Sequence, residues 1–510
     1  MGRKILFVTT DQQRYDGLGC NGGEIARTPV VDRLAADGIS YHRAYNQNVV
    51  CMPARSTMVT GQYVSTHGVY ANGVPLPPET PTIAGHLHAS AGYRTALIGK
   101  AHFEPGLDLE MKFRENQLAR DDSTGPYRGF EHMELAMHGP YVLWHYGKWL
   151  RSVDRDAAKG FYQLFDASGM RGDSGGDTGA PQVAVNPIPR GEYHTDWVAD
   201  RTIAYLDALD PDDDWFVWMS FPDPHHPWDP PASELKRVPW RDLDLPAGHP
   251  GTPERCEKIL AGKPWHWRAW FEGTFDNVEG GPTTFVPAQM THDQVREVNA
   301  ITHVENELID EALGRVLRRI DERGWGNDTD VIFTTDHGEL QGDFGLLFKG
   351  PYHVDALMRL PCVWRPAPAV GVAPATIDDP VGQVDLAPTF CEIAGVRAAE
   401  WMQGRPLPSV PDPTRERMIT EWESQFDAVD MHLRTIYRDG WVCTTYGAGG
   451  PGGVYDGDEG ELYELAADPN QWENRWADTG CRAIRDDLVV DLRDHLPPEH
   501  EPRLAVAAPA

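Results

Sequence analysis

Four short segments rich in apolar and β-branched residues are spread along this chain, and polar residues follow each one. They span residues 5–10, 95–99, 215–220 and 331–335. Alternation of such segments with helical patterns is typical of an α/β fold built on a mainly parallel sheet. Ligands bind such sheets at the carboxyl ends of the strands. We therefore expect one site to be assembled from the four following sequences, Asp11-Gln12, Lys100-Ala101-His102, Pro224-His225-His226-Pro227 and Asp336-His337-Gly338.

A long amphipathic segment precedes the fourth strand. Between residues 293 and 323, apolar residues recur at intervals of three and four, which predicts a helix with one buried stripe. Gly324 provides a stop signal, so this helix is expected to be the crossover that leads to Asp336. Its charged residues are assigned to the solvent side: Glu305, Glu307, Arg318 and Arg319.

The charge of the chain restricts its partners. With 46 Lys and Arg against 77 Asp and Glu, the formal charge of the 510 residues is −31. This charge disfavours nucleic acid and anionic membrane surfaces as partners. A small anionic substrate is compatible with it only if cations gather locally at the site.

The cysteine content and the first residues predict a soluble, cytoplasmic protein. Seven cysteines without paired spacing indicate reduced thiols rather than a disulfide framework. The apolar run at 5–10 is too short for a signal-peptide core or a membrane span. Leu6 also departs from the myristoylation pattern.

The segment Cys51-Met52-Pro53-Ala54-Arg55, which continues to Thr60-Gly61, is a Cys-x-Pro-x-Arg sequence. Cysteine in this sequence is a substrate for conversion to formylglycine. A buried structural cysteine in front of a proline is the alternative interpretation. The choice between the two depends on whether the chain also supplies a metal site and cations.

Both requirements are met by residues elsewhere in the sequence. Hard divalent cations prefer oxygen ligands, and adjacent residues at two strand ends can approach one ion from two sides. A strand-end aspartate is more often part of a turn or a helix cap, so it is the two pairs together that indicate a metal site. The predicted metal ligands are Asp11, Gln12, Asp336 and His337, and the cations left to face an anionic substrate are Arg55, Lys100 and Lys349.

Together these motifs resemble the sulfatase family of the alkaline phosphatase superfamily over nearly the whole chain. The resemblance implies an alkaline phosphatase-like α/β sandwich, with a large mainly parallel sheet flanked by helices and a smaller C-terminal antiparallel sheet. Many relatives carry a second aspartate at the position of Gln12 and asparagine at that of His337. Because histidine softens the site, Mn²⁺ is as compatible with it as the Ca²⁺ common in the family.

The resemblance also implies roles on the nucleophile side of the site. Cys51, converted to formylglycine and hydrated, would attack the central atom of the substrate, while one divalent ion holds a substrate oxygen. Arg55 would steady the diol. His102 would take a proton from the covalent sulfo-enzyme intermediate, so that it collapses to the aldehyde and releases the anion.

On the substrate side, Lys100 and Asn72 would bind oxygens of the transferring group. His225 fits the Pro-His-x-Pro pattern and, with Lys349 of the glycine-rich loop 342–350, would protonate or stabilise the departing oxygen. His226 is expected to be a neighbour rather than a catalyst.

The predicted activity is hydrolysis of sulfate esters, with aryl sulfates as the expected substrates. Phosphonate monoester hydrolases and phosphodiesterases are the alternative, together with choline sulfatase-like enzymes. The first two usually show tyrosine and threonine at the positions of Lys100 and His102, so the Gly-Lys-x-His arrangement here favours a sulfatase. Sulfate monoesters, phosphonate monoesters and phosphodiesters are all monoanions, so one site could serve several. Maturation implies a formylglycine-generating enzyme as a partner.

The C-terminal part is predicted to be a separate unit. A catalytic domain over 1–405 and a proline-rich link at 406–413 precede a subdomain over 414–510. In this subdomain, residues 433–437 and 441–445 indicate a hairpin, 461–465 a further strand, and 485–495 a terminal helix. The tail from 496 is expected to reach a neighbouring subunit of a homo-oligomer, a dimer or tetramer.

Two other segments carry no motif. The aromatic tract 264–271 is compatible with a leaving-group pocket, an oligomer contact or the core. The glycine-rich stretch 171–179 indicates a mobile loop.

Overall fold

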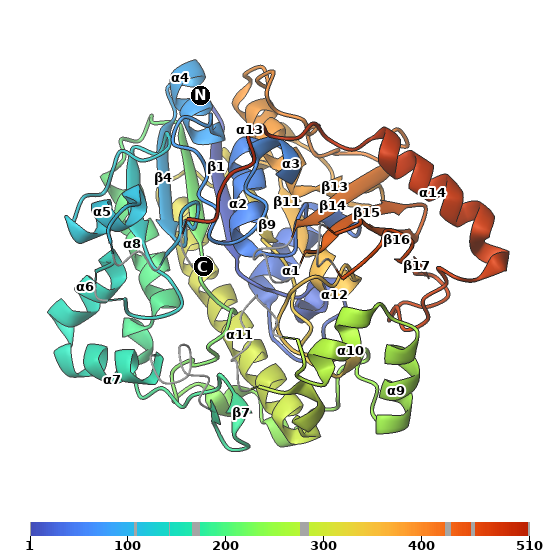
Figure 1. Cartoon of the computed structure of the whole chain (residues 1–510). Coiled ribbons are helices and arrows are strands. Elements are labelled where there is room, and N and C mark those ends of the chain that lie inside the picture. Colours follow the sequence, from blue (N-terminus) through green and yellow to red (C-terminus); the bar gives the residue numbers. More distant parts are fainter. Residues whose placement is uncertain are drawn as a thin grey trace.

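An eight-stranded sheet runs through the centre of the computed structural model (Figure 1). The structure describes residues 2–106, 110–141, 143–165, 174–275, 285–423, 430–449 and 454–507. The strand order is β12 (Ala375–Ile377), β2 (Ile39–Tyr41), β11 (Cys362–Arg365), β9 (Thr329–Thr335), β1 (Lys4–Thr10), β8 (Trp215–Ser220), β4 (Arg94–Gly99) and β5 (His132–Leu135).

The four strands predicted from the sequence are neighbours in this sheet. β9, β1, β8 and β4 follow one another, and each pairs in parallel with the next. β5 continues the parallel pairing, whereas β11 runs antiparallel to both β9 and β2. The mainly parallel sheet is therefore confirmed, and the carboxyl ends of its central strands lie at one edge.

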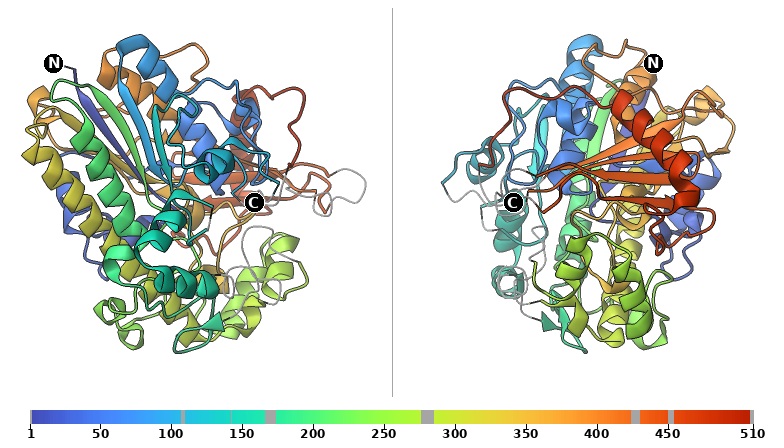
Figure 2. Two further views of the ribbon diagram at one scale, coloured as in Figure 1. Left: turned by 90° about the vertical axis from the view of Figure 1, so that its left-hand side faces the viewer. Right: turned by 45° about the vertical axis from the view of Figure 1, so that its right-hand side comes forward.

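Helices cover both faces of the sheet (Figure 2). Because side chains alternate along a strand, Ile5 and Phe7 of β1 point to one face, while Leu6 and Val8 point to the other. The first pair packs on α2 (Cys51–Thr60), α4 (Ile83–Ala91) and α13 (Leu386–Ala394). The second pair packs on α1 (Pro29–Ala36), α8 (His194–Ala208) and α11 (His292–Glu322).

The crossover helix α11 is confirmed, but part of its charged face was assigned wrongly. A capping box between Thr291 and Gln294 starts the helix. Glu305 is 0% exposed and Glu307 is 5% exposed, whereas Arg318 and Arg319 do lie toward solvent. The loops before α1 and after β8 cover this side of the helix, and Glu307 accepts hydrogen bonds from Arg27 N–H and Arg237. Helical periodicity cannot predict such coverage.

The smaller antiparallel sheet consists of β14 (Arg417–Glu423), β15 (His432–Arg438), β16 (Trp441–Tyr446) and β17 (Gly460–Glu464). Helix α14 (Arg482–Asp494) packs on its outer face. The hairpin, the third strand and the terminal helix are confirmed, and β14 was not predicted. Glu421 of β14 donates its N–H to Gln47 O and accepts at its own carbonyl from Asn48 Nδ2. The small sheet thereby contacts the segment that leads into Cys51.

The described part of the tail lies along its own chain. His500 N–H donates to Ser65 O at 2.7 Å, and Ala507 N–H donates to Gly73 O at 2.8 Å. Arg503 lies 4.3 Å from the ring centroid of Tyr70. The tail therefore packs beside α3 (Val64–His67) and the loop after it. The subunit count stays a prediction.

The remaining elements are short or lie at the periphery. Trp267 and Trp270 of α10 (Trp265–Phe271) are buried in the core, as one of the three interpretations of the aromatic tract expected, and Trp265 is half exposed. Of the glycine-rich stretch 171–179, residues 171–173 lie outside the described residues, and Ser174–Gly175 form the short strand β6. Across the described ranges, we find no helix that combines the length and the apolar character needed to cross a membrane. The other elements are β3 (Ala44–Tyr45), β6 (Ser174–Gly175), β7 (Ala180–Pro181), β10 (Arg359–Leu360), β13 (Val381–Gly382), α5 (Arg114–Arg120), α6 (His145–Val153), α7 (Arg155–Phe165), α9 (Pro253–Ala261) and α12 (Asp355–Met358).

The close approach of β4 to β8 gives a test of the strand arrangement. Gly99 has φ +110°, and a Cβ added there would lie 1.7 Å from Ser220 O. We expect Gly99→Ala to lower the free energy of unfolding by about 3 kcal/mol or more, because overpacking and positive-φ strain act together. Gly92→Ala is the matched control, since Gly92 has φ +72° but no atom within 4 Å of the added Cβ. Urea unfolding measures both, and equal losses would contradict the arrangement.

Candidate active site

Cys51 is the first residue of α2, a helix whose ten residues are all buried. Pro53 is tolerated in this first turn because the N–H groups there have no partner within the helix. The Cys51 Sγ lies 3.1 Å from His337 Nε2 and 3.7 Å from Asp11 Oδ1. Burial raises the pKa of the Cys51 thiol to about 12, and Asp11 adds to the rise. At neutral pH the unmodified side chain is therefore a protonated thiol, which is a poor nucleophile.

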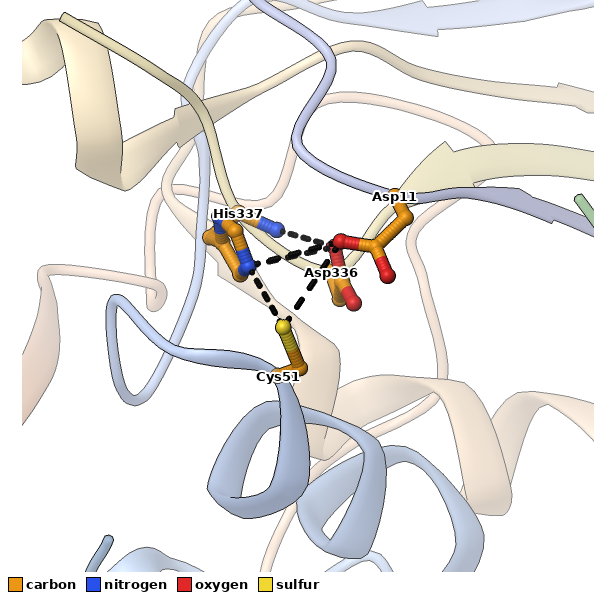
Figure 3. A group of neighbouring side chains, drawn as sticks. All are labelled: Asp11, Cys51, Asp336 and His337. Carbon is orange, nitrogen blue, oxygen red and sulfur yellow. Dashed lines mark hydrogen bonds and ion pairs between the residues drawn. The ribbon is translucent and has the colours of Figure 1, made fainter. Parts of the chain in front are cut away.

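Four potential ligand atoms lie close together at the N-terminus of α2 (Figure 3). One atom each of Asp11, Cys51, Asp336 and His337 lies within 4.8 Å of all the others, and all four residues are buried. Asp336 Oδ1 accepts the N–H groups of Gln12 and His337, at 3.1 and 2.9 Å, which fixes the carboxylate. His337 Nδ1–H donates to Gly338 O at 2.9 Å, so the lone pair of Nε2 faces the group.

The protonation states of this group suit a divalent ion. Burial raises the pKa of Asp11, but Lys100 and Arg55 outweigh it and hold that pKa well below its usual range. Burial lowers the pKa of His337 to about 4, so its imidazole is neutral. An ionised carboxylate and a neutral imidazole are the forms that bind metals. The residues present therefore fit a metal ion.

Gln12 lies apart from this group of four. Its Oε1 accepts from Lys349 Nζ at 2.6 Å, and its Nε2 lies 3.0 Å from His226 Nδ1. Gln12 also has φ +63°, a strained backbone conformation for a residue other than glycine. The structure thus brings three of the four predicted metal ligands together with Cys51, and metal ligation by Gln12 stays a prediction.

Arg55 lies one helical turn after Cys51 and is fully buried. Its Nε donates to Asp336 Oδ2 at 2.8 Å, and its Nη1 donates to Lys100 O and Ser220 Oγ at 2.8 and 2.9 Å. Its Nη2 lies 3.6 Å from Asp11 Oδ2 and has no hydrogen-bond partner among the described residues. Arg55 therefore joins the ends of β9, β4 and β8, and the two N–H groups of Nη2 are left for a ligand.

Each predicted lysine is held between an oxygen and an imidazole. Lys100 Nζ donates to Asp11 Oδ2 and lies 2.8 Å from His138 Nε2. Lys349 Nζ lies 2.8 Å from His225 Nε2, which places the predicted pair side by side, and donates to Gln12. An imidazole that accepts from an ammonium group adds no negative charge. Lys349 therefore has two neutral partners, Gln12 and His225, whereas Lys100 is also paired with the Asp11 carboxylate.

His102 and Asn72 complete the predicted set. His102 has φ +56°, and both of its ring nitrogens are buried without a partner among the described residues. Burial, with Lys100 next, holds the pKa of His102 well below its usual range, so the ring is a neutral base. Asn72 Oδ1 accepts the N–H of Met52, the residue after Cys51, at 2.9 Å.

Two residues that contact the site escaped prediction, His138 and Gln383. His138 follows β5, a strand too short to be recognised by pattern, and its signal would have been a fifth strand end. His226, predicted to be a neighbour rather than a catalyst, does lie beside the site and hydrogen-bonds Gln12. Gln383 Nε2 donates to Thr335 O and Asp336 O, at 3.0 and 2.7 Å, and supports the end of β9. Gln383 lies in no motif of its own.

The family follows from a comparison with known proteins. Residues 3–396 match the family model described as Sulfatase, which is most of the 510-residue chain. The chain therefore belongs to the sulfatase family, in agreement with the resemblance seen in its motifs.

Individual relatives cover most of the chain. The chain is 26% identical over 503 residues to "Uncharacterized sulfatase YidJ" of Escherichia coli (strain K12), which covers 96% of this chain and 87% of that protein. It is 27% identical over 431 residues to an "Arylsulfatase" of Clostridium perfringens, and this match covers 82% of this chain and 80% of that protein. Its fold is similar to that in the crystal structure of a phosphonate monoester hydrolase of Agrobacterium radiobacter, with a TM-score of 0.78 and 24% sequence identity. The match covers 97% of this chain and 96% of that one.

Binding of an ion to the group of four can be tested without turnover. With Mn²⁺ or Ca²⁺ at about 100 times its dissociation constant, we expect the unmodified protein to gain about 2.7 kcal/mol of stability, measured by thermal unfolding. Asp11→Asn and His337→Ala should reduce or remove this gain, because the first removes the negative charge of a ligand and the second removes a ligand atom. Asp491→Asn, which disrupts ion pairs of the small sheet, should lower stability and leave the gain intact. A gain of equal size in all variants would place the ion elsewhere.

Proposed function

We propose that this sulfatase-family protein hydrolyses sulfate esters, with aryl sulfates as substrates, through a formylglycine at position 51 and one divalent ion. The observation that carries the proposal is the convergence of three buried cations, Arg55, Lys100 and Lys349, on the group that contains Cys51. The ester would be split by water into an alcohol or phenol and sulfate.

The charges of the site favour a compact anion. Three cationic side chains face two carboxylates, Asp11 and Asp336, so the net charge is 3 − 2 = +1 before any ion binds. A divalent ion raises this to +3. Buried positive charge attracts an anion far more strongly than the same charge in water. The acidic surface of the chain does not oppose this, because the excess of positive charge is local.

Position 51 calls for a nucleophile other than a thiol. The Cys51 thiol is protonated at neutral pH, and Sγ already lies among the metal-ligand atoms. Oxidation to formylglycine replaces sulfur by an aldehyde oxygen, whose hydrated form supplies a hydroxyl nucleophile, while a divalent ion held by Asp11, Asp336 and His337 supplies Lewis acidity. Arg55 keeps the two N–H groups of Nη2 without a hydrogen-bond partner among the described residues, beside this position.

Lys349 and His102 would serve the two proton transfers of the reaction. His225 Nδ1 donates to His226 O, so its Nε2 accepts from Lys349. The ammonium of Lys349 is then the donor that can stabilise or protonate the departing oxygen. His102, neutral and with both nitrogens unpartnered among the described residues, is the base for the later proton removal.

Lys100 and His102 are the residues that favour sulfate over phosphonate chemistry. Lys100 is held between Asp11 and His138, which fixes the position of its ammonium group where the transferring group would bind. A phosphate transferase of the same superfamily would use serine or threonine and two metals, whereas the described residues form one ligand group around Cys51.

The identity of residue 51 is the first test. After expression with a formylglycine-generating enzyme, mass spectrometry of the peptide that contains Cys51 should show loss of one sulfur and two hydrogens and gain of one oxygen. The peptide with Cys256 serves as the internal control and should keep its thiol, because Cys256 lies outside such a motif. An intact thiol at 51 in an active preparation would refute the proposed nucleophile.

Substrate choice is tested on one matured preparation. We expect kcat/KM for an aryl sulfate to exceed that for an aryl phosphonate monoester and a phosphodiester. Lys100→Ala should lower the aryl sulfate value by about 100- to 1,000-fold, the usual loss when one charge-stabilising donor is removed. Lys258→Ala, at an exposed position of α9, is the control and should have no effect. Unchanged sulfate turnover in Lys100→Ala would contradict the assignment.

A further inference from the structure

His138 occupies a position that the roles assigned above leave unexplained. It lies three residues beyond β5, and its side chain is buried. Its Nε2 lies 2.8 Å from Lys100 Nζ and 3.7 Å from Asp11 Oδ2. Its ring stacks on that of His225, with centroids 3.8 Å apart and planes 17° from parallel. His138 therefore touches both the lysine assigned to the transferring group and the histidine assigned to the departing oxygen.

The hydrogen bonds define the form of this imidazole. An ammonium group has donors and no acceptor, so Lys100 donates and His138 Nε2 accepts. The ring is then neutral, with its proton on Nδ1. That Nδ1 is buried and has no partner among the described residues. A buried donor without a partner typically costs about 1–3 kcal/mol, so the Nδ1–H of His138 is left as a donor that a water or a substrate atom could satisfy.

A neutral acceptor can orient the ammonium group of Lys100 without adding negative charge beside it, which a carboxylate cannot do. Asp11 also holds Lys100, but a carboxylate offsets part of the positive charge of the ammonium, and its oxygens belong to the group that fits an ion. An imidazole orients the ammonium through one lone pair and adds no further negative charge. The stacking on His225 restrains the plane of the ring, in which that lone pair lies.

We propose that His138 is a positioning residue of the site, a neutral acceptor that aims Lys100 at the transferring group of the substrate without cancelling its charge. The proposal rests on the proposed function for the identity of that group, sulfate. The roles assigned from the sequence motifs do not include His138. The proposal adds this residue and requires that its side chain be neutral.

Three substitutions separate the properties of His138. His138→Gln keeps a neutral acceptor and loses the ring. His138→Phe keeps a ring that can stack on His225 and loses the acceptor. His138→Glu introduces a side chain of the size of glutamine that carries a negative charge.

Two measurements are made on each variant. The unmodified thiol form, in MnCl₂, is titrated with inorganic sulfate by calorimetry. The matured form is assayed with two aryl sulfates, one of an acidic and one of a weakly acidic phenol.

We expect His138→Gln to stay close to wild type in sulfate affinity and in kcat/KM. His138→Phe should weaken both by about 10- to 100-fold, the worth of one hydrogen bond to a charged group. His138→Glu should weaken both more than His138→Phe does, because it neutralises Lys100. Since Lys100 serves the transferring group, the loss in His138→Phe should be the same factor for the two phenols.

Three results would overturn the proposal. They are wild-type sulfate affinity in His138→Phe, equal behaviour of the Gln and Glu variants, and a loss in His138→Phe confined to the weakly acidic phenol, which would mean that His138 acts through His225. Sulfate titration needs neither maturation nor turnover. If the expected order of affinities appears but the matured enzyme does not cleave aryl sulfates, the proposed substrate fails while the role of His138 stands.

Discussion

The site depends on the mutual neutralisation of charges buried at the carboxyl edge of the central sheet. Asp11 and Asp336 are 0% exposed, and burial of an unpaired carboxylate is costly. Arg55 contacts both carboxylates, and Lys100 contacts Asp11. Removal of one partner from such a buried pair typically costs about 3–5 kcal/mol. The same contacts that make these charges tolerable also fix the geometry around Cys51, so stability and preorganisation have one origin here.

Distant parts of the chain support that geometry. Arg55 joins the ends of three strands, and Gln383 holds the backbone at the end of β9. From the small sheet, β14 bonds the segment that leads into α2, while the tail packs against the loop that carries Asn72. The proposed C-terminal subdomain is therefore in direct contact with the elements that position Cys51 and Asn72.

The sequence predicted those parts that local patterns determine. The central strands and Asp11, Lys100 and Asp336 at their ends follow from apolar runs and from the rule that parallel strands share a carboxyl edge. The burial of Glu305 and the place of His138 depend on loops folding over a helix and on a short outer strand. Such tertiary coverage leaves no periodic signal. The roles of the assigned residues rest on the family resemblance and on the contacts described here.

The most direct measurement is anomalous diffraction from crystals of the matured protein grown with Mn²⁺. The account predicts one ion between Asp11, Asp336 and His337, with an oxygen of the residue at position 51 beside it. Two results would contradict the central claim. One is an ion bound away from these three side chains, and the other is a protein that cleaves aryl sulfates although no ion is bound at this site.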